Sequence, residues 1–97
     1  MQIEDVLGNR LRIKILKILN LMGELNVSEV ARRIGANYKT TMEHLKILED
    51  EGILRHKRFG RIRLYRFDTN SAKARAIQSL IESWEKNEKA DKAFQNH

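Results

Sequence analysis

One short segment of the chain carries a run of side chains that bind phosphate. Residues 54–67 read LRHKRFGRIRLYRF, and six of these fourteen residues are Lys or Arg, whereas none is Asp or Glu. Guanidinium and ammonium groups spaced in this way are the electrostatic footprint of a protein that binds a polyanion, usually nucleic acid. The alternative is a solvated face that keeps the protein soluble.

The sequence on either side of this segment is neutral, and this favours one of the two interpretations. The net charge is +6. Residues 1–52 contain eight Lys or Arg and eight Asp or Glu, and residues 68–97 contain five of each kind, so the excess lies entirely in residues 53–67. Because solubility does not require charge to be segregated, the pattern favours a surface that binds a polyanion.

Length and composition predict one globular domain spanning residues 1–97. Hydrophobic residues make up 41% of the 97 residues and charged residues 33%, a mixture typical of a folded protein. The sequence has no Cys, which excludes disulfides and thiolate metal sites. No apolar run approaches the roughly 20 residues that span a bilayer, and the N-terminus lacks the pattern of a signal peptide. We therefore expect a cytoplasmic protein without a membrane partner.

The first predicted element is a helix over residues 2–22, ended by Gly23. Its apolar residues recur at helical spacing and cover more than half of the circumference. A helix with so wide an apolar arc is expected to pack against its own core and also against a second subunit. The apolar residues are Leu7, Leu11, Ile15, Ile18 and Met22 on one stripe, with Ile13, Leu16 and Leu19 beside it.

Two further helices follow with the proportions of a helix-turn-helix. After a short extended piece or turn at Asn26, the first begins with Ser28 as its predicted N-cap and ends at Gly35. The second is capped by Asn37 and runs over residues 38–51, with Gly52 as its stop signal.

The period then changes from helical to strand-like. Residues 53–59 and 61–67 flank Gly60, as two antiparallel strands around a tight turn would. A hairpin directly after a helix-turn-helix makes a winged helix, so the predicted fold is mainly α with a small β-hairpin. A last helix over residues 71–94 carries one apolar stripe, and the tail over residues 89–97 is expected to fray.

At this point the sequence resembles a known family. The segment GNRLRIKILKILN, residues 8–20, resembles the first helix of winged-helix regulators of the arsenic-repressor (ArsR) type. The segment VSEVARRIGANYKTTMEHLKILEDEGIL, residues 27–54, resembles their helix-turn-helix, in which a Thr-rich helix start leads into His-Leu and Leu-Glu-x-x-Gly. The NYKTT start is similar to archaeal members. The resemblance implies a homodimeric transcriptional regulator that binds a duplex operator.

Recognition of bases requires a helix whose exposed N-terminal half offers donors and acceptors to the major groove. If Thr41, Leu45 and Leu48 face inward, the opposite face presents charged side chains. Lys39 would meet a guanine edge or a phosphate, and Glu43 would accept from a cytosine amine. The predicted contacts on this helix are Asn37, Tyr38, Lys39, Thr40, Met42, Glu43 and Lys46.

Strand alternation limits which basic residues of the wing can face DNA. Arg58 and Arg61 flank Gly60 at the tip and are predicted to contact the backbone or the minor groove, with Arg63 next. Among the apolar wing residues, we expect Leu54, Ile62 and Leu64 in the core. Phe59 and Tyr65 could stack on single-stranded bases, but packing is the commoner role of strand aromatics.

The last helix is predicted to form a dimer, because the first helix already has apolar surface to spare. Two recognition helices would then read half-sites about one DNA turn apart. The pattern does not decide whether the first helix, the last helix or both form the interface. The candidate interface residues are Leu11, Ile15, Ile77, Ile81 and Trp84.

Three other functions remain open at this point. These are a non-specific architectural winged helix on DNA, an RNA-binding one, and a protein-interaction winged helix whose basic wing docks on an acidic partner. We expect no enzymatic activity and no cofactor, since no phosphate loop or nucleophile motif is present. We also expect no metal site, because His44, His56 and His97 are scattered and the metal-sensing members of the family use Cys or paired Asp and His ligands.

Overall fold

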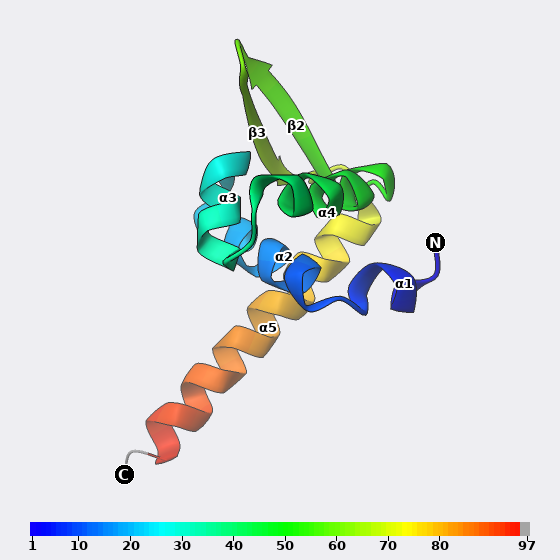
Figure 1. Ribbon diagram of the computed structural model, residues 1–97. Helices are drawn as coiled ribbons and strands as arrows, with labels where there is room; N and C mark the ends of the chain where they lie inside the picture. The colour runs from blue at the N-terminus through cyan, green and yellow to red at the C-terminus, as the bar shows by residue number, and fades with distance from the viewer. Residues whose placement is uncertain (96–97) are drawn as a thin grey trace.

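The helices and strands follow the order predicted from the sequence, with one additional break. The computed structural model describes the backbone of residues 1–95 and the side chains of residues 1–92. The elements are α1 (Ile3–Leu7), α2 (Arg10–Met22), β1 (Glu24–Asn26), α3 (Val27–Ile34), α4 (Tyr38–Asp50), β2 (Leu54–Phe59), β3 (Ile62–Phe67) and α5 (Ala72–Gln95). The mainly α winged helix-turn-helix is therefore confirmed (Figure 1).

The prediction of one helix over residues 2–22 was wrong, because the chain breaks at Gly8 and Asn9. Asn9 has an extended backbone, and its side chain accepts a hydrogen bond of 3.1 Å from the backbone N–H of Arg12. This capping starts α2 and separates it from α1. The apolar stripe continues across the break, so periodicity alone did not reveal it. Gly23 ends α2, as predicted.

The helix-turn-helix is set by its capping residues. The N-cap of α3 is Asn26 and not Ser28 as predicted, since its side chain accepts from the N–H of Glu29 at 2.8 Å. This earlier start places Val27 in the core, where it is only 2% exposed. Gly35 ends α3 in the left-handed region at φ 71°, which suits a residue without a Cβ. Asn37 caps α4 through the N–H of Thr40, as predicted.

The wing belongs to a three-stranded antiparallel sheet. The strand order is β1-β3-β2, so the short segment β1 pairs with the second strand of the hairpin. This pairing connects the wing to the start of α3 and anchors the base of the hairpin beside the helix-turn-helix. In β2 and β3 the cross-strand partners run from Leu54 opposite Phe67 to Phe59 opposite Ile62.

The core lies where α2, α3, α4 and the base of the hairpin meet. Fully buried side chains come from each of these elements: Ile15, Leu16, Leu19, Val30, Leu45, Leu48, Leu54 and Tyr65. Burying one such side chain contributes roughly 1.5–3 kcal/mol before the entropy cost of folding. Leu64 is half-buried, but Ile62 is 51% exposed, so its predicted core position was wrong. Ile62 lies next to the turn, beyond the reach of the helices.

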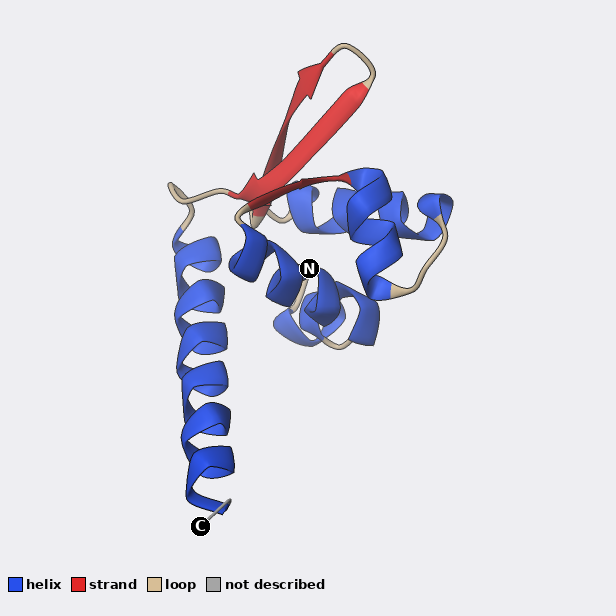
Figure 2. Ribbon diagram, turned by 90° about the vertical axis from the view of Figure 1, so that its left-hand side faces the viewer, coloured by secondary structure: helices blue, strands red, loops and turns tan. Residues whose placement is uncertain are grey.

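The last helix leaves the body of the molecule. Its first half packs on α2 through the buried Ala74 and the partly buried Ile77 and Ile81. Its second half projects away from the side that carries the hairpin (Figures 1 and 2), and the molecule measures 50 × 27 × 22 Å. The segment predicted to fray is helical as far as Gln95, and its residues 96–97 lie outside the described residues.

A buried arginine connects three helices, and the sequence did not reveal it. Arg12 is only 8% exposed. Its Nε donates to the carbonyl of Val6 at 2.7 Å, and its Nη2 donates to the carbonyl of Asp5 at 2.7 Å. Its Nη1 lies 3.1 Å from Nδ1 of His44 in α4. Because a guanidinium has only donors, this Nδ1 must accept, and the neutral ring then carries its proton on Nε2.

This contact makes folding depend on the protonation state of His44. Burial and the neighbouring charge of Arg12 lower the pKa of His44 below its usual 6.5, while Glu43 on the same helix opposes the shift. The unfolded chain therefore takes up the proton at a higher pH than the folded chain does. By linkage, the contribution is fully present above about pH 6.5, the ordinary pKa, and is lost as the pH falls from there through the lowered pKa of the folded state.

We expect the wild type to lose more stability than His44→Gln between about pH 7.5 and about pH 5.5. Glutamine can still accept a hydrogen bond from Arg12, but it cannot take up a proton. Urea unfolding at several pH values measures the difference between the two proteins. Equal losses in both would show that the Arg12–His44 contact has no proton-linked effect on folding.

Candidate nucleic-acid interface

The helix α4 has a buried inner face and a polar outer face. Thr41, Leu45 and Leu48 are each 0% exposed, and the hydroxyl of Thr41 is satisfied by the carbonyl of Asn37 at 2.8 Å. Lys39, Glu43 and Lys46 on the opposite face are exposed. At the margins, Tyr38 is exposed at the first position of the helix, and Thr40 and Met42 are half-buried. The structure therefore brings all the side chains predicted on this helix to one side or to its margins.

Two of these residues have only part of their surface free. The side-chain oxygen of Asn37 is engaged in capping α4, so only its amide NH₂ remains to meet a phosphate or a base. Met42 packs against the core and offers only the rest of its flexible side chain.

The acidic end of α4 is occupied by contacts inside the chain. Glu49 Oε2 lies 2.6 Å from Nδ1 of His56 on the wing. Glu51 pairs with the N-terminal ammonium at 2.9 Å and with Lys73 at 3.1 Å, and these two charges lower the pKa of the Glu51 carboxyl. These pairs hold both carboxylates away from a ligand on the outer face, as a phosphate-binding surface requires.

His56 has a structural role that sequence reasoning missed. Besides its contact with Glu49 of α4, its ring lies on that of the buried Tyr65, with 5.0 Å between the centroids. The contact holds the base of the wing against α4. Tyr65 is 1% exposed, so this aromatic is a packing residue and has no face for stacking on a base.

The register of the hairpin separates the basic residues onto two faces. Leu54 and His56 pair with Phe67 and Tyr65 on the face that packs on the helices, and the next pair on that face is Arg58 with Arg63. Because side chains alternate along a strand, this arginine pair continues the face that lies beside α4. The other face carries Arg55 and Lys57 of β2 and Arg66 of β3, and Arg61 lies in the turn at the tip.

Two arginine pairs lie directly across the hairpin from each other. Arg58 stands opposite Arg63, and Arg55 stands opposite Arg66. Like charges at such positions destabilise a sheet. A polyanion on the face that lies beside α4 would relieve this repulsion for the Arg58–Arg63 pair.

The candidate dimer residues do not form one surface. Ile15 is 0% exposed. Its assignment to a dimer interface was wrong, because the whole side chain packs inside the core. Leu11, Ile77 and Ile81 are half-buried, whereas Trp84 is 66% exposed. Trp84 lines a shallow hollow of about 270 Å³ together with Leu7, Ile13 and Leu80.

A metal site and a membrane-spanning helix were also considered for the described part of the chain. There, no three His, Cys, Asp or Glu side chains come together in a group that could hold a metal ion. His97 lies outside the described residues. Within the described helices, none combines the length and apolarity that crossing a bilayer requires.

Similarity to known proteins agrees with this geometry. The sequence profile of the arsR family of bacterial regulatory proteins matches residues 9–56. A cadmium resistance transcriptional regulatory protein CadC homolog of Staphylococcus aureus is 34% identical over 67 residues, which are 69% of this chain and 55% of that protein. An uncharacterized HTH-type transcriptional regulator, B-115, of Sulfolobus spindle-shape virus 1 is 32% identical over 82 residues, which cover 79% of this chain and 71% of its own length.

A solved structure resembles the fold over nearly the whole chain. It is the homodimeric winged helix-turn-helix DNA-binding domain of a possible ArsR-family transcriptional regulator from Mycobacterium bovis, with a TM-score of 0.68 and 26% identity. The similarity covers 96% of this chain and 79% of that one. These relatives are regulators rather than enzymes, in agreement with the prediction of a non-enzymatic function. From its sequence, its fold and the side chains presented by α4 and the wing, this chain belongs to the ArsR family of winged-helix, DNA-binding transcriptional regulators.

Proposed function

We propose that this protein is a sequence-specific transcriptional regulator that binds duplex DNA in the cytoplasm as a homodimer. The observation that carries the proposal is the alignment of two surfaces. The polar face of α4 and the Arg58–Arg63 pair of the wing lie on the same side of the molecule, since the Glu49–His56 contact holds the wing on α4. A duplex would meet both surfaces at once.

In this proposal α4 lies in the major groove. Lys39 meets a guanine edge or a phosphate, and Glu43 accepts from a cytosine amine. The remaining contacts, from Asn37, Tyr38, Thr40, Met42 and Lys46, position the helix on phosphates and base edges. Arg58, Arg61 and Arg63 bind the backbone or enter the minor groove, and so supply affinity and register rather than most of the sequence reading.

The proposed dimer uses the exposed apolar surface on α2 and α5. Trp84 and Leu80 are 66% and 58% exposed, and Ile13 is 36% exposed. Large apolar side chains gathered in this way mark interaction sites. The homodimeric state of the related Mycobacterium domain supports a second copy of the chain as the partner. The C-terminal helix, predicted over residues 71–94 and observed as α5, would then set the distance between the two recognition helices.

The second candidate is a winged helix that binds DNA or RNA without sequence preference. Salt dependence cannot separate the two, because phosphate contacts dominate both modes of binding. The exposed Lys39 and Glu43 on α4 favour sequence reading, since a purely architectural protein has no need of a carboxylate facing the duplex.

A selection of bound duplexes from a random pool tests sequence specificity directly. We expect an enriched site with two symmetric halves about 10 base pairs apart, and a changed preference at one position in each half for Lys39→Ala. Thr69→Ala, an exposed change in the turn before α5, is the control and should enrich the wild-type site. Recovery of unenriched sequences would favour the non-specific candidate.

The wing is tested by its contribution to the salt dependence of binding. We expect Arg58→Ala plus Arg63→Ala to reduce the slope of log affinity against log salt by about 1–2. Each phosphate contact releases counterions from DNA, so fewer counterions are released when contacts are lost. Arg55→Ala plus Arg66→Ala is the matched control, since it removes the arginine pair from the opposite face of the same hairpin. Fluorescence anisotropy at several salt concentrations measures both slopes. Equal changes in the two double variants would contradict the assignment of faces.

The dimer surface is tested by introducing a charge into it. Trp84→Glu should shift the protein towards monomer in light scattering, because a carboxylate would have to be desolvated at the interface. Leu21→Glu is the control, since Leu21 is 77% exposed and lies outside the hollow that contains Trp84. A Trp84→Glu protein that stays dimeric would remove α5 from the proposed interface.

A further inference from the structure

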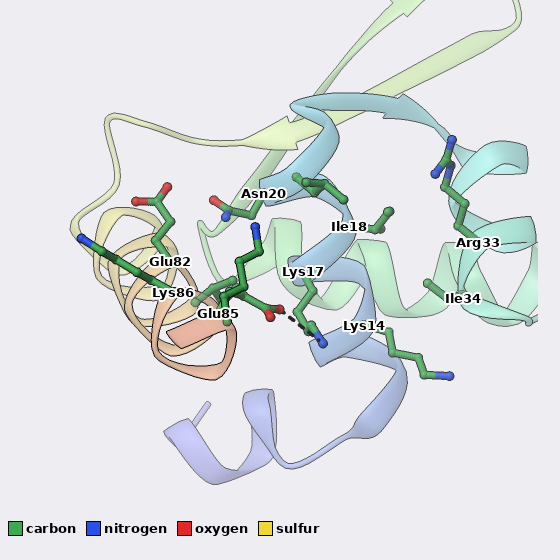
Figure 3. A pocket seen from close by; sticks show the side chains of 12 residues that line it. Lys14, Lys17, Ile18, Asn20, Arg33, Ile34, Glu82, Glu85 and Lys86 are labelled. Carbon is green, nitrogen blue, oxygen red and sulfur yellow. Dashed lines mark ion pairs between the residues drawn. The ribbon is translucent and has the colours of Figure 1, made fainter. Parts of the chain in front are cut away.

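A second, larger hollow lies on the other side of the contact between α2 and α5. It has a volume of about 680 Å³ and is enclosed by α2, by the second half of α5 and by the C-terminal end of α3 (Figure 3). Small-molecule sites in proteins have volumes of roughly 300–1,000 Å³. We call it the α2–α5 groove.

The inner surface of the groove is aliphatic. Ile18 and Leu21 of α2, Ile34 of α3 and Ile81 of α5 all line it. Leu21 is 77% exposed, so a large apolar side chain faces water at the edge of the groove. An apolar ligand body would cover this surface and gain hydrophobic free energy by doing so.

The rim of the groove is cationic. Five basic side chains line it, namely Lys14, Lys17, Arg33, Lys86 and Lys89, together with the two carboxylates Glu82 and Glu85. Lys17 pairs with Glu85 at 3.4 Å, and Arg33 pairs with Glu29 at 2.9 Å, outside the groove. Even if Glu82 pairs with one of the remaining lysines, two ammonium groups at the rim have no carboxylate partner among the described side chains. An anion is therefore the complementary ligand.

The groove is largely separate from the two proposed interfaces. It shares only Lys17, Ile81 and Glu85 with the hollow that contains Trp84, so the two hollows flank the Lys17–Glu85 ion pair. The half of α5 that borders it also projects away from the hairpin and therefore from the DNA-binding side (Figures 1 and 2). The groove therefore lies away from the proposed DNA surface and meets the proposed dimer surface only at this ion pair.

We propose that the α2–α5 groove binds a small amphipathic anion, a carboxylate on an aliphatic body. The body packs against Ile18, Leu21 and Ile81, and the carboxylate lies among the basic groups of the rim. This site stands independently of DNA binding. Among the ion pairs of the described residues, only Lys17–Glu85 holds α5 to α2 beyond Ile81. If the proposed function holds, this weak attachment gives the site a regulatory role. A ligand bridging the two helices would fix the angle of α5 and with it the geometry of the dimer.

Decanoate is a suitable probe, used with the full chain and below its micelle-forming concentration. In a titration followed by amide NMR shifts, we expect decanoate to perturb residues of α2 and α5 that line the groove. Decanol and decyltrimethylammonium have the same body without the negative charge, and we expect both to bind more weakly. Because no DNA is present, failure of this titration would reject the site without affecting the proposed function.

Two neighbouring arginines provide a matched pair of variants. Arg32 and Arg33 both bind Glu29 on α3, but only Arg33 lines the groove. We expect Arg33→Glu to weaken decanoate binding by roughly tenfold, since an attraction becomes a repulsion, and Arg32→Glu to leave it nearly unchanged. Lys86→Glu should act like Arg33→Glu, and it leaves α3 intact. The proposal is overturned if Arg32→Glu and Arg33→Glu act equally, if decanol binds as tightly as decanoate, or if the shifts are confined to the hollow around Trp84.

Discussion

The buried contact between α2 and α4 is the constraint on which the rest of the molecule depends. Ile15, Leu16 and Leu19 of α2 share one core with Leu45 and Leu48 of α4, all of them 0–1% exposed. This packing fixes the rotation of α4 about its own axis, and so decides which side chains face outward. Lys39, Glu43 and Lys46 face outward because Thr41, Leu45 and Leu48, one or two positions away from them along the helix, are needed in the core.

Polar contacts around this core then set the other parts in place. Arg12 holds the carbonyl end of α1 and reaches His44 on α4, so the N-terminal segment is tied to the recognition helix. Glu49 at the other end of α4 holds His56 and hence the wing. Buried or half-buried groups of this kind stabilise one arrangement strongly, because an unpaired donor or acceptor inside the protein is costly.

The hairpin side of the molecule and the second half of α5 differ in their proposed roles and in their physical character. The hairpin carries the uncompensated positive charge, and its base is well packed against α4. The second half of α5 has little contact with the body and carries exposed apolar side chains on one face and basic groups on another. A helix held so loosely is suited to transmit a change, since a second subunit or a bound ligand can shift its angle without disturbing the core.

The sequence by itself determined the element types and most of their limits. Asn37, Gly35 and Gly52 act locally through capping and backbone conformation, and the basic hairpin was visible as a segregated charge. The apolar period of α4 predicted its inner face correctly, because one helix face follows from spacing alone. The break at Gly8 was missed, since the apolar stripe crosses it.

Only the tertiary structure decided the remaining features, because each depends on residues far apart in the chain. Ile15 and Trp84 look alike in an apolar pattern, but Ile15 is buried in the core and Trp84 faces solvent. The face assigned to each wing arginine required the register of β2 and β3 and the position of α4. The bond from Arg12 to His44 spans 32 residues, and the groove between α2 and α5 exists only where the two helices diverge. Spacing within one element cannot encode such contacts, because they arise from how separate elements pack together.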